Sequence, residues 1–227
     1  MKKIRFIVAT RESASNFHQK TLTGQSLNIF KVPFLELKLY PDNSEGLSHI
    51  YNKEIDLAAN DPAILVFAHD DLLFLGYYWV NDIFNAMQAF DVVGITGNKR
   101  RLPHQSSWVF KDADRHVEDL ENLSGVVGHG SSYPPQQLNI YGQPGQEVKL
   151  LDGMLLMADS DVLHRHALRF DERFKFHFYD MDLCRQAEVM GLRMGTWPIS
   201  LVHQSGGNYQ SEAWKTGYQT YIDKWEN

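Results

Sequence analysis

The chain has 227 residues, a formal net charge of −6, 43% hydrophobic residues and 22% charged residues. This composition is typical of a globular protein and excludes a largely disordered or fibrous one. Lysines and arginines are scattered and the pI is near 5.9, so the charge pattern argues against nucleic acid as a partner. Cys184 is the one cysteine of the sequence, which excludes an internal disulfide and a zinc site built from thiolates.

Hydropathy predicts no membrane segment. No apolar run approaches the ~20 residues of a membrane helix, and the apolar stretch in the starting residues, MKKIRFIVATRES, soon turns polar. We therefore expect neither a signal peptide nor an anchor. A single cysteine fits a reducing compartment, so we expect a cytoplasmic protein. The length favours one α/β domain over residues 1–227.

In chain order, the first hundred residues alternate between predicted strands and helices. Apolar or β-branched runs predict buried strands over 4–10, 63–68 and 91–96. Apolar residues at spacings of three and four predict helices over 44–59, with Ser44 as the N-cap, and over about 78–90. This order predicts right-handed crossovers and a mainly parallel sheet.

The later part of the chain begins with a stretch rich in Gly, Ser, Pro and Gln over 122–146. It predicts a long loop, either a lid or acceptor-contacting loop, or a solvated connection without a role. The run VKLLDGMLLMA then predicts a return to the sheet, followed by a short helix capped by Ser160 or Asp161.

The C-terminal tail has aromatic residues at spacings of three and four: Trp214, Tyr218, Tyr221 and Trp225. This stripe predicts a helix that packs on the domain, or alternatively one that lines an acceptor groove or a dimer contact.

Acidic residues cluster where the predicted second strand ends, at His69, Asp70 and Asp71. In open parallel sheets, ligands bind beyond the carboxyl ends of the strands. Buried carboxylates repel one another and lose solvation, and a divalent cation removes that cost. Mg²⁺ or Mn²⁺ with water and phosphate oxygens fits such a site, which indicates a phosphorylated ligand. The alternative is that Asp70 or Asp71 caps the following turn.

A second acidic segment, FYDMDLC, begins a predicted helix that ends at Gly191. Asp180 lies near its N-cap and Asp182 in its first turn, where both are favoured by backbone donors. The aromatic surroundings would also raise the basicity of a carboxylate, as a general base requires. His203 follows another apolar run and is either a structural histidine or a further ligand, especially for Mn²⁺.

Several common nucleotide and catalytic motifs are missing from the sequence, including the P-loop, G-x-G-x-x-G after the first strand, H-E-x-x-H and G-x-S-x-G. The basic turn at Lys99, Arg100 and Arg101 either meets a diphosphate or is a solvated charge cluster.

Taken in order, a first strand ending in Thr10 and four later segments resemble the family-2 glycosyltransferases with the GT-A fold, and in particular a small bacterial branch with streptomycin-biosynthesis-protein-like domains. The segments are GLSHIYNKEIDLAANDPAILVFAHDDLLF, LDGMLLMADSDVL, RFDERFKFHFYDMDLCRQAEVMGLRMGTWP and LVHQSGG. The resemblance implies an α/β fold with a Rossmann-like, mostly parallel central sheet flanked by helices. It implies a nucleotide-binding half over 1–100 and an acceptor-side half over 101–227.

The resemblance also implies residue roles on the donor side. The HDD segment matches a D-x-D-type element, in which Asp71 holds the cation and Asp70 faces the ribose or donor sugar. His69 stands where the usual triplet has an acid, and it remains on the donor side. His203 matches a histidine that ligates the metal or contacts the diphosphate. Further donor residues implied are Thr10 and Arg11, at the nucleotide base, and more weakly Asp42, Asn43 and Asn52.

On the acceptor side, the segment YDMDL matches the family's E-D-x-D-L, which makes Asp180 the catalytic base. Tyr179 replaces the glutamate of that motif. Asp152, Gly153 and Asp182 are assigned to the acceptor and donor sugar.

The implied reaction is inverting, metal-assisted transfer of a sugar from a nucleoside diphosphate, UDP by default, to a hydroxyl of a saccharide or another acceptor. Because His69 and Tyr179 replace acids, one alternative is an inactive nucleotide-sugar-binding or scaffold protein with the same fold. A further alternative is a metal-dependent phosphohydrolase or nucleotidyltransferase.

Overall fold

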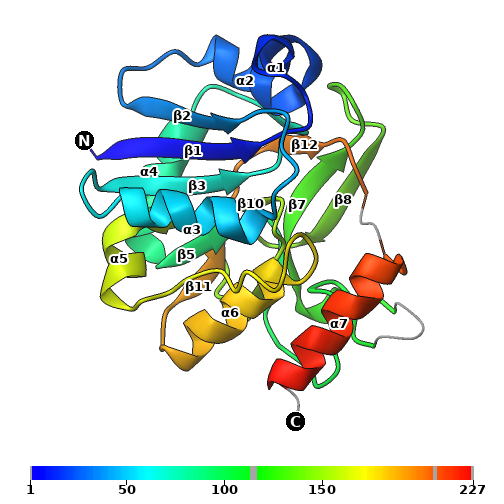
Figure 1. The fold of residues 1–227 in the computed structure, drawn as a ribbon. Coiled ribbons are helices and arrows are strands. Elements are labelled where there is room, and N and C mark those ends of the chain that lie inside the picture. Colours follow the sequence, from blue (N-terminus) through cyan, green and yellow to red (C-terminus); the bar gives the residue numbers. More distant parts are fainter. Residues whose placement is uncertain (1, 113–116, 207–208, 226–227) are drawn as a thin grey trace.

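The computed structural model describes residues 2–112, 117–206 and 209–225 (Figure 1). Its central sheet has six strands in the order β11-β5-β10-β3-β1-β2. β1 pairs in parallel with β2 and β3, and β5 pairs in parallel with β11, while β10 runs antiparallel to β3 and β5. The mainly parallel sheet predicted from the sequence is therefore confirmed. The strands are β1 (Lys3–Ala9), β2 (Leu35–Tyr40), β3 (Ala63–Ala68), β5 (Val92–Gly94), β10 (Leu155–Asp159) and β11 (Met194–Thr196).

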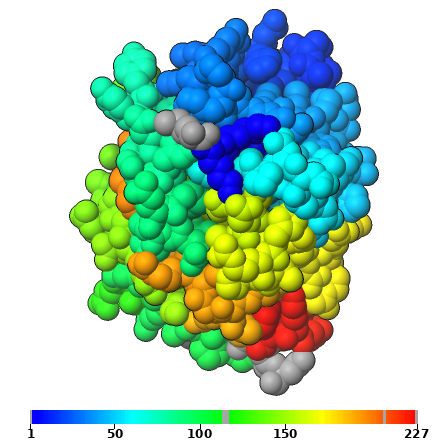
Figure 2. All heavy atoms as spheres, turned by 90° about the vertical axis from the view of Figure 1, so that its left-hand side faces the viewer, coloured from blue at the N-terminus to red at the C-terminus, as the bar shows by residue number. Residues whose placement is uncertain are grey.

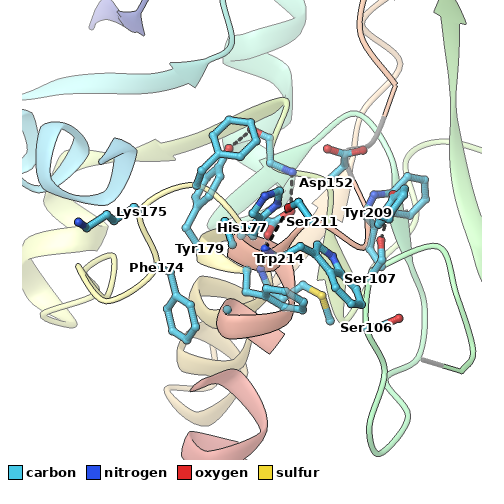
Figure 3. Close-up of a pocket in the computed structure, with 18 of the residues that line it drawn as sticks. Ser106, Ser107, Asp152, Phe174, Lys175, His177, Tyr179, Tyr209, Ser211 and Trp214 are labelled. Atoms are coloured by element: carbon cyan, nitrogen blue, oxygen red, sulfur yellow. Dashed lines mark hydrogen bonds between the residues drawn. The ribbon is translucent and has the colours of Figure 1, made fainter. Parts of the chain in front are cut away.

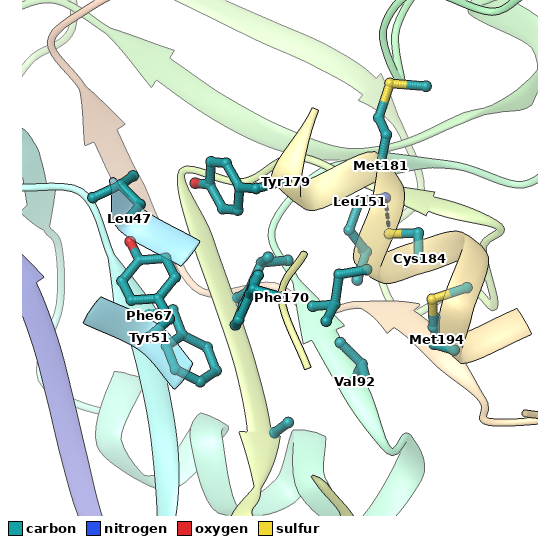
Figure 4. Close-up of a cluster of buried hydrophobic side chains, with 14 of the residues drawn as sticks. Leu47, Tyr51, Phe67, Val92, Leu151, Phe170, Tyr179, Met181, Cys184 and Met194 are labelled. Carbon is teal, nitrogen blue, oxygen red and sulfur yellow. Dashed lines mark hydrogen bonds between the residues drawn. The ribbon is translucent and has the colours of Figure 1, made fainter. Parts of the chain in front are cut away.

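Helices cover both faces of this sheet because β1 and β3 alternate their side chains between two cores. Ile64, Val66 and Ala68 face one core, and Leu65 and Phe67 face the other. The first core includes residues of α1 (Ala14–Lys20), α2 (Leu22–Ile29) and α4 (Trp79–Ala89). The second, shown in part in Figure 4, includes residues of α3 (Leu47–Leu57), α5 (Ser160–Arg165), α6 (Tyr179–Val189) and α7 (Glu212–Trp225).

A second sheet continues from the carboxyl end of the first, in the order β4-β12-β7-β6-β9, with β8 paired to β7. A 3-10 turn, Leu120–Asn122, leads into β7. The strands are β4 (Leu72–Phe74), β6 (Gly97–Asn98), β7 (Leu123–His129), β8 (Gln137–Gly142), β9 (Leu150–Leu151) and β12 (Leu201–His203).

The long loop predicted over 122–146 is wrong, because β7 and β8 form an antiparallel pair there. Two of its glycines, Gly125 and Gly128, lie where the packing leaves no room for a side chain. A Cβ on Gly125 would lie 2.2 Å from the Ile95 carbonyl oxygen, and one on Gly128 would lie 2.9 Å from Pro135. Crowding around the strand pair therefore explains these glycines. The prediction failed because a glycine-rich strand pair has the same composition as a loop.

Two predicted helix caps are also wrong. α3 begins at Leu47 after Gly46 and has no side-chain cap, so Ser44 lies outside it. The Leu47 amide instead donates to the Lys175 carbonyl oxygen, 2.8 Å away. α5 is capped by Asp159, whose side chain accepts from the Asp161 amide. At α3 a backbone contact with the distant Lys175 takes the place of the predicted cap. At α5 the cap is the residue before Ser160.

The C-terminal helix predicted from the aromatic stripe is confirmed as α7. Trp214 and Tyr221 are buried, and their rings lie 5.5 and 5.6 Å from that of Phe178. Figure 2 views the molecule toward the N-terminal end of β1, with the N-terminal segments at the top and the end of α7 at the bottom. In the described ranges, no helix combines the length and the apolar character required to cross a bilayer.

One buried carboxylate fixes the end of α7. Asp182 is fully buried, and its Oδ1 accepts from Trp225 Nε1 at 2.7 Å and pairs with Lys224 Nζ at 2.6 Å. Its Oδ2 accepts from Gln186 Nε2 at 2.7 Å. Asp182 therefore links α6 to α7 within the core.

We expect Asp182→Ala to lower the free energy of unfolding by ~1–3 kcal/mol, because it leaves the Trp225 indole N–H and the Gln186 amide without their acceptor and leaves Lys224 paired with Asp171 alone. Urea unfolding followed by tryptophan fluorescence measures this change. Asp56→Ala is the control, since the Asp56 carboxylate is 70% exposed and pairs with Arg169 at the surface. Equal stability of the two variants would contradict the role of Asp182.

Candidate functional site

A cavity of about 1050 Å³ opens where the two sheets meet. It is lined by residues that follow β3 and β12, by the turn before β10, by the start of α6, by the 106–109 segment and by α7. Figure 3 shows the close-up, with Ser106 and Ser107 on a loop, Ser211 and Trp214 at the start of α7, and Lys175 directed away from them. The cavity therefore brings together segments from the whole length of the chain at the carboxyl end of β3.

A carboxylate and two imidazoles meet at one end of this cavity. His69, Asp71 and His203 each offer one atom that could bind a metal ion, and these three atoms lie within 4.8 Å of one another. Asp71 Oδ2 accepts from the Ser205 amide at 3.0 Å, and its Oδ1 lies 3.3 Å from His203 Nε2. Burial works against ionisation, but contact with His203 and Ser205 holds the pKa of Asp71 well below its ordinary value. Asp71 is therefore a carboxylate near neutral pH.

The donor set fits a divalent cation. Asp71 Oδ1 is buried, and apart from His203 Nε2 at 3.3 Å, whose direction is poor for a hydrogen bond, no described residue offers it a proton. An ionised oxygen in that position costs free energy unless a cation or a proton donor faces it. Burial lowers the pKa of His203, but the hydrogen bond and the charge of Asp71, together with the charge of Asp152, raise it overall. Positive charge is therefore favoured at this position. One carboxylate and two imidazoles suit Mn²⁺ and similar ions.

Asp70 is held by a different strand. Thr10, at the end of β1, donates from Oγ1 to Asp70 Oδ2 at 2.5 Å. Arg11 follows Thr10 and lines the cavity. Asp70 and Asp71 thus make side-chain contacts with distant segments and do not cap the local turn, the alternative that the sequence left open.

Asp180 lies at the second position of α6 and lines the same cavity. Its Oδ2 accepts from the Gly153 amide and its Oδ1 from the Met181 amide, both at 2.9 Å. Burial first, and then repulsion from Asp152, raises the pKa of Asp180 to about 7. A carboxylate with that pKa is a competent general base near neutral pH.

Tyr179 and His69, the two residues found where acids were expected, contact each other. The Tyr179 hydroxyl lies 3.0 Å from His69 Nε2 and 2.7 Å from the Gly153 carbonyl oxygen, to which it donates. Figure 4 shows Tyr179 extending from the start of α6 toward Tyr51 in the core. Burial lowers the pKa of His69, so its imidazole is neutral at pH 7.

Comparison with known proteins identifies the family. A model of a glycosyltransferase-like family matches residues 36–224, well over half of the chain. The chain belongs to this glycosyltransferase-like family. The resemblance to family-2 glycosyltransferases is thereby confirmed, and the family and fold support a role in glycosyl transfer.

One solved structure supports the fold, and two others are similar at lower scores. The catalytic domain of Drosophila β1,4-galactosyltransferase 7, in complex with xylobiose, is 10% identical with a TM-score of 0.51, covering 96% of this chain and 80% of that chain. TarS from S. aureus is 15% identical with a TM-score of 0.49, covering 89% and 37%. A197 from STIV is 11% identical with a TM-score of 0.47, covering 92% and 98%. The fold of the glycosyltransferase-like chain is GT-A. No curated protein sequence matches it.

Most residues predicted for the glycosyltransferase site lie together. The residues that line the cavity are Arg11, His69, Asp152, Gly153, Asp180 and His203. Three more are bonded to one another or to a lining residue: Asp71 to His203, and Asp70 to Thr10. Asp42 and Asn43 lie next to Thr10, since the Asn43 amide donates to the Thr10 carbonyl oxygen at 2.8 Å. The Asn43 side chain bonds to the backbone of Glu45.

Asn52 and Asp182 lie elsewhere. Asn52 bonds to the backbone of Phe170 and to Glu172, and it lines a separate, smaller cavity. Asp182 bonds to α7, as described above. In the basic turn, Arg100 is paired with Asp119 at 2.7 Å and does not line the large cavity.

An aromatic wall was not predicted from the sequence. Trp108, Tyr141, Tyr209 and Trp214 line the cavity together with hydroxyls of Ser106, Ser107 and Ser211. The Trp108 and Tyr141 rings lie 5.1 Å apart, edge to face. No spacing along the chain joins these residues, because they come from three separate segments. Of them, only Trp214 carried a signal, as part of the aromatic stripe.

Gly153 has no room for a side chain. A Cβ there would lie 2.5 Å from the Tyr179 hydroxyl and 3.1 Å from Asp180 Cβ. We expect Gly153→Ala to lower the free energy of unfolding by ~1–3 kcal/mol through overpacking, which thermal or urea unfolding measures. The matched control is Gly206→Ala, because nothing lies within 4 Å of a Cβ on Gly206. If both variants were as stable as the parent, the packing argument would fail.

Proposed function

We propose that the protein is an inverting glycosyltransferase that moves a sugar from a nucleoside diphosphate sugar to an acceptor hydroxyl with the help of Mn²⁺ or Mg²⁺. The observation that carries this proposal is the presence in one cavity of a carboxylate with a pKa of about 7, Asp180, and of the Asp71–His203 pair. These two groups supply the base and the cation site that inverting transfer with a diphosphate leaving group requires.

On the donor side, Asp71 and His203 would hold the cation, which when bound offsets the charge that develops on the departing diphosphate. Asp70, oriented by Thr10, would contact the ribose or donor sugar, and Arg11 would contact the nucleotide. We take UDP as the carrier by default, and we assign the nucleotide side to residues 1–100.

On the acceptor side, Asp180 would remove the proton from the attacking hydroxyl, which then displaces the diphosphate from the opposite face of the anomeric carbon. Two backbone amides orient its carboxylate. Asp152 keeps it basic by repulsion and lies on the same cavity wall. The proton therefore leaves on Asp180 while the new glycosidic bond forms.

The aromatic wall supports a saccharide as the acceptor. Sugar rings present C–H faces that pack on aromatic side chains and hydroxyls that bond to serines, and both kinds of group line this part of the cavity. Residues 101–227 contribute the wall, so we assign the acceptor side to this half.

The test is to incubate the purified protein with nucleotide sugars, saccharide acceptors and Mn²⁺, and to determine the anomeric configuration of any glycoside. An inverted glycoside is expected. A retained configuration contradicts the mechanism, no glycoside with any pair favours the scaffold alternative, and phosphate or pyrophosphate release without glycoside favours a phosphohydrolase or nucleotidyltransferase.

We expect Asp180→Asn to lower kcat by ~10²–10⁴-fold, because the amide cannot accept the proton of the acceptor hydroxyl. Donor binding, followed by the shift in melting temperature with nucleotide sugar and Mn²⁺, should persist. Asp56→Asn, at the distant surface, should leave kcat unchanged. Normal transfer by Asp180→Asn would exclude this residue as the base.

The pH dependence of transfer follows from the same carboxylate. Because the base acts when deprotonated, kcat should rise as pH increases through about 7, the raised pKa of Asp180. Asp152→Asn removes a neighbouring negative charge, so it should lower the pKa of Asp180 and move this limb to lower pH. A kcat–pH profile of both proteins measures the shift, and a limb that stays in place or moves upward argues against the coupling.

A further inference from the structure

Two side chains that stand in place of expected acids form one hydrogen-bonded unit beside the proposed cation site. Tyr179 Oη donates to the Gly153 carbonyl oxygen at 2.7 Å. A carbonyl oxygen only accepts, so the single phenolic proton is committed to that bond. His69 Nε2 lies 3.0 Å from the same hydroxyl oxygen. The bond between them therefore requires His69 Nε2 to carry the proton and donate it.

This assignment fixes the tautomer of His69. A neutral imidazole has one N–H and one nitrogen with a free lone pair. With Nε2 donating to Tyr179, the lone pair lies on Nδ1. Histidines that ligate metals commonly donate their other ring N–H to an oxygen, which sets the tautomer and the ring orientation. The Gly153 carbonyl and the Tyr179 hydroxyl would serve His69 in this way.

The ring of His69 is also held in place by its surroundings. Its amide donates to the Met154 carbonyl oxygen at 3.0 Å, and its ring stacks on Phe176 at 5.8 Å and 19°. The ring centroids of His69 and His203 lie 5.9 Å apart. Asp71 belongs to the same group of candidate ligands, and its buried Oδ1 lies 3.3 Å from His203 Nε2.

We propose that His69 is a third ligand of the cation through Nδ1, that Tyr179 is the residue that positions it, and that the site consequently prefers Mn²⁺ or a later first-row divalent ion to Mg²⁺. This inference rests on the proposed cation role of Asp71 and His203. Mg²⁺ favours all-oxygen coordination, whereas first-row transition ions bind imidazole nitrogens with an affinity that increases from Mn²⁺ through Fe²⁺ to Co²⁺. Two nitrogens and one carboxylate oxygen shift the balance away from Mg²⁺.

The replacements at 69 and 179 then compensate each other. Two acids in these positions would add negative charge next to Asp71, Asp152 and Asp180. Histidine and tyrosine instead add a neutral ligand and a neutral donor that bond to each other. The departures that suggested an inactive scaffold thus leave a complete set of metal ligands.

The test is direct binding of Mn²⁺ to the purified protein without any sugar, by electron paramagnetic resonance. Pulsed measurements should show coupling to two imidazole nitrogens in the parent protein and to one in His69→Ala. Tyr179→Phe keeps the ring in the core but removes the hydroxyl, and it should weaken Mn²⁺ binding by ~10-fold or more. The matched control is Tyr40→Phe, which also removes a partly buried hydroxyl, one that bonds to Glu54 at 2.7 Å and does not line the cavity.

Competition with Mg²⁺ adds a second readout. His69→Asp replaces a nitrogen ligand by an oxygen ligand, so it should reduce the ratio of Mn²⁺ affinity to Mg²⁺ affinity. Near-ultraviolet circular dichroism verifies that each variant is folded. If Tyr179→Phe does not fold, the number of coupled nitrogens in the parent protein and the competition with Mg²⁺ decide whether His69 is a ligand. One coupled nitrogen in the parent protein, or equal Mn²⁺ affinity of Tyr179→Phe and Tyr40→Phe, overturns the proposal. Because no donor or acceptor is present, these results are independent of whether a glycoside is formed.

Discussion

Two aspartates, Asp152 and Asp180, line the cavity and two more, Asp70 and Asp71, follow its lining residue His69, and the arrangement of the site follows from the ways in which these four charges are accommodated. Asp71 is paired with His203 and a backbone amide. Asp70 accepts a hydroxyl from Thr10, and Asp152 accepts from the Met154 amide. Asp180 accepts from two backbone amides, but burial and then repulsion from Asp152 raise its pKa to about 7. Like charges at close range in a partly desolvated site cannot all be ionised at low cost, so the four carboxylates acquire different chemical roles from their different neighbours.

The sequence predicted those parts of the site that follow from local pattern and sheet topology. The buried run at 63–68 is β3, and the rule that ligands bind beyond strand ends located His69 and Asp71. The helix stripe after Phe178 located Asp180 at the start of α6. These predictions needed only the period of apolar residues and the direction of one strand.

What the sequence could not predict depends on contacts between distant segments. The hydrogen bond between His69 and Tyr179 joins residues separated by 110 positions, and no local pattern indicates it. The same holds for Asn52, which forms hydrogen bonds with Phe170 and Glu172, and for Trp108 in the aromatic wall. Glycines of β7 looked like loop residues because composition does not distinguish a flexible segment from a crowded strand pair.

Gly153 gives the site a property that no single side chain provides. Its N–H bonds to Asp180, and its C=O bonds to Tyr179, which in turn contacts His69. One backbone residue thus joins the proposed base to the proposed metal ligand, and a hydrogen atom is the largest side chain that allows this proximity. A displacement of Gly153 would therefore move the proposed base and the proposed metal ligand together, so one backbone residue would couple the two ends of the proposed reaction without any contact between the substrates.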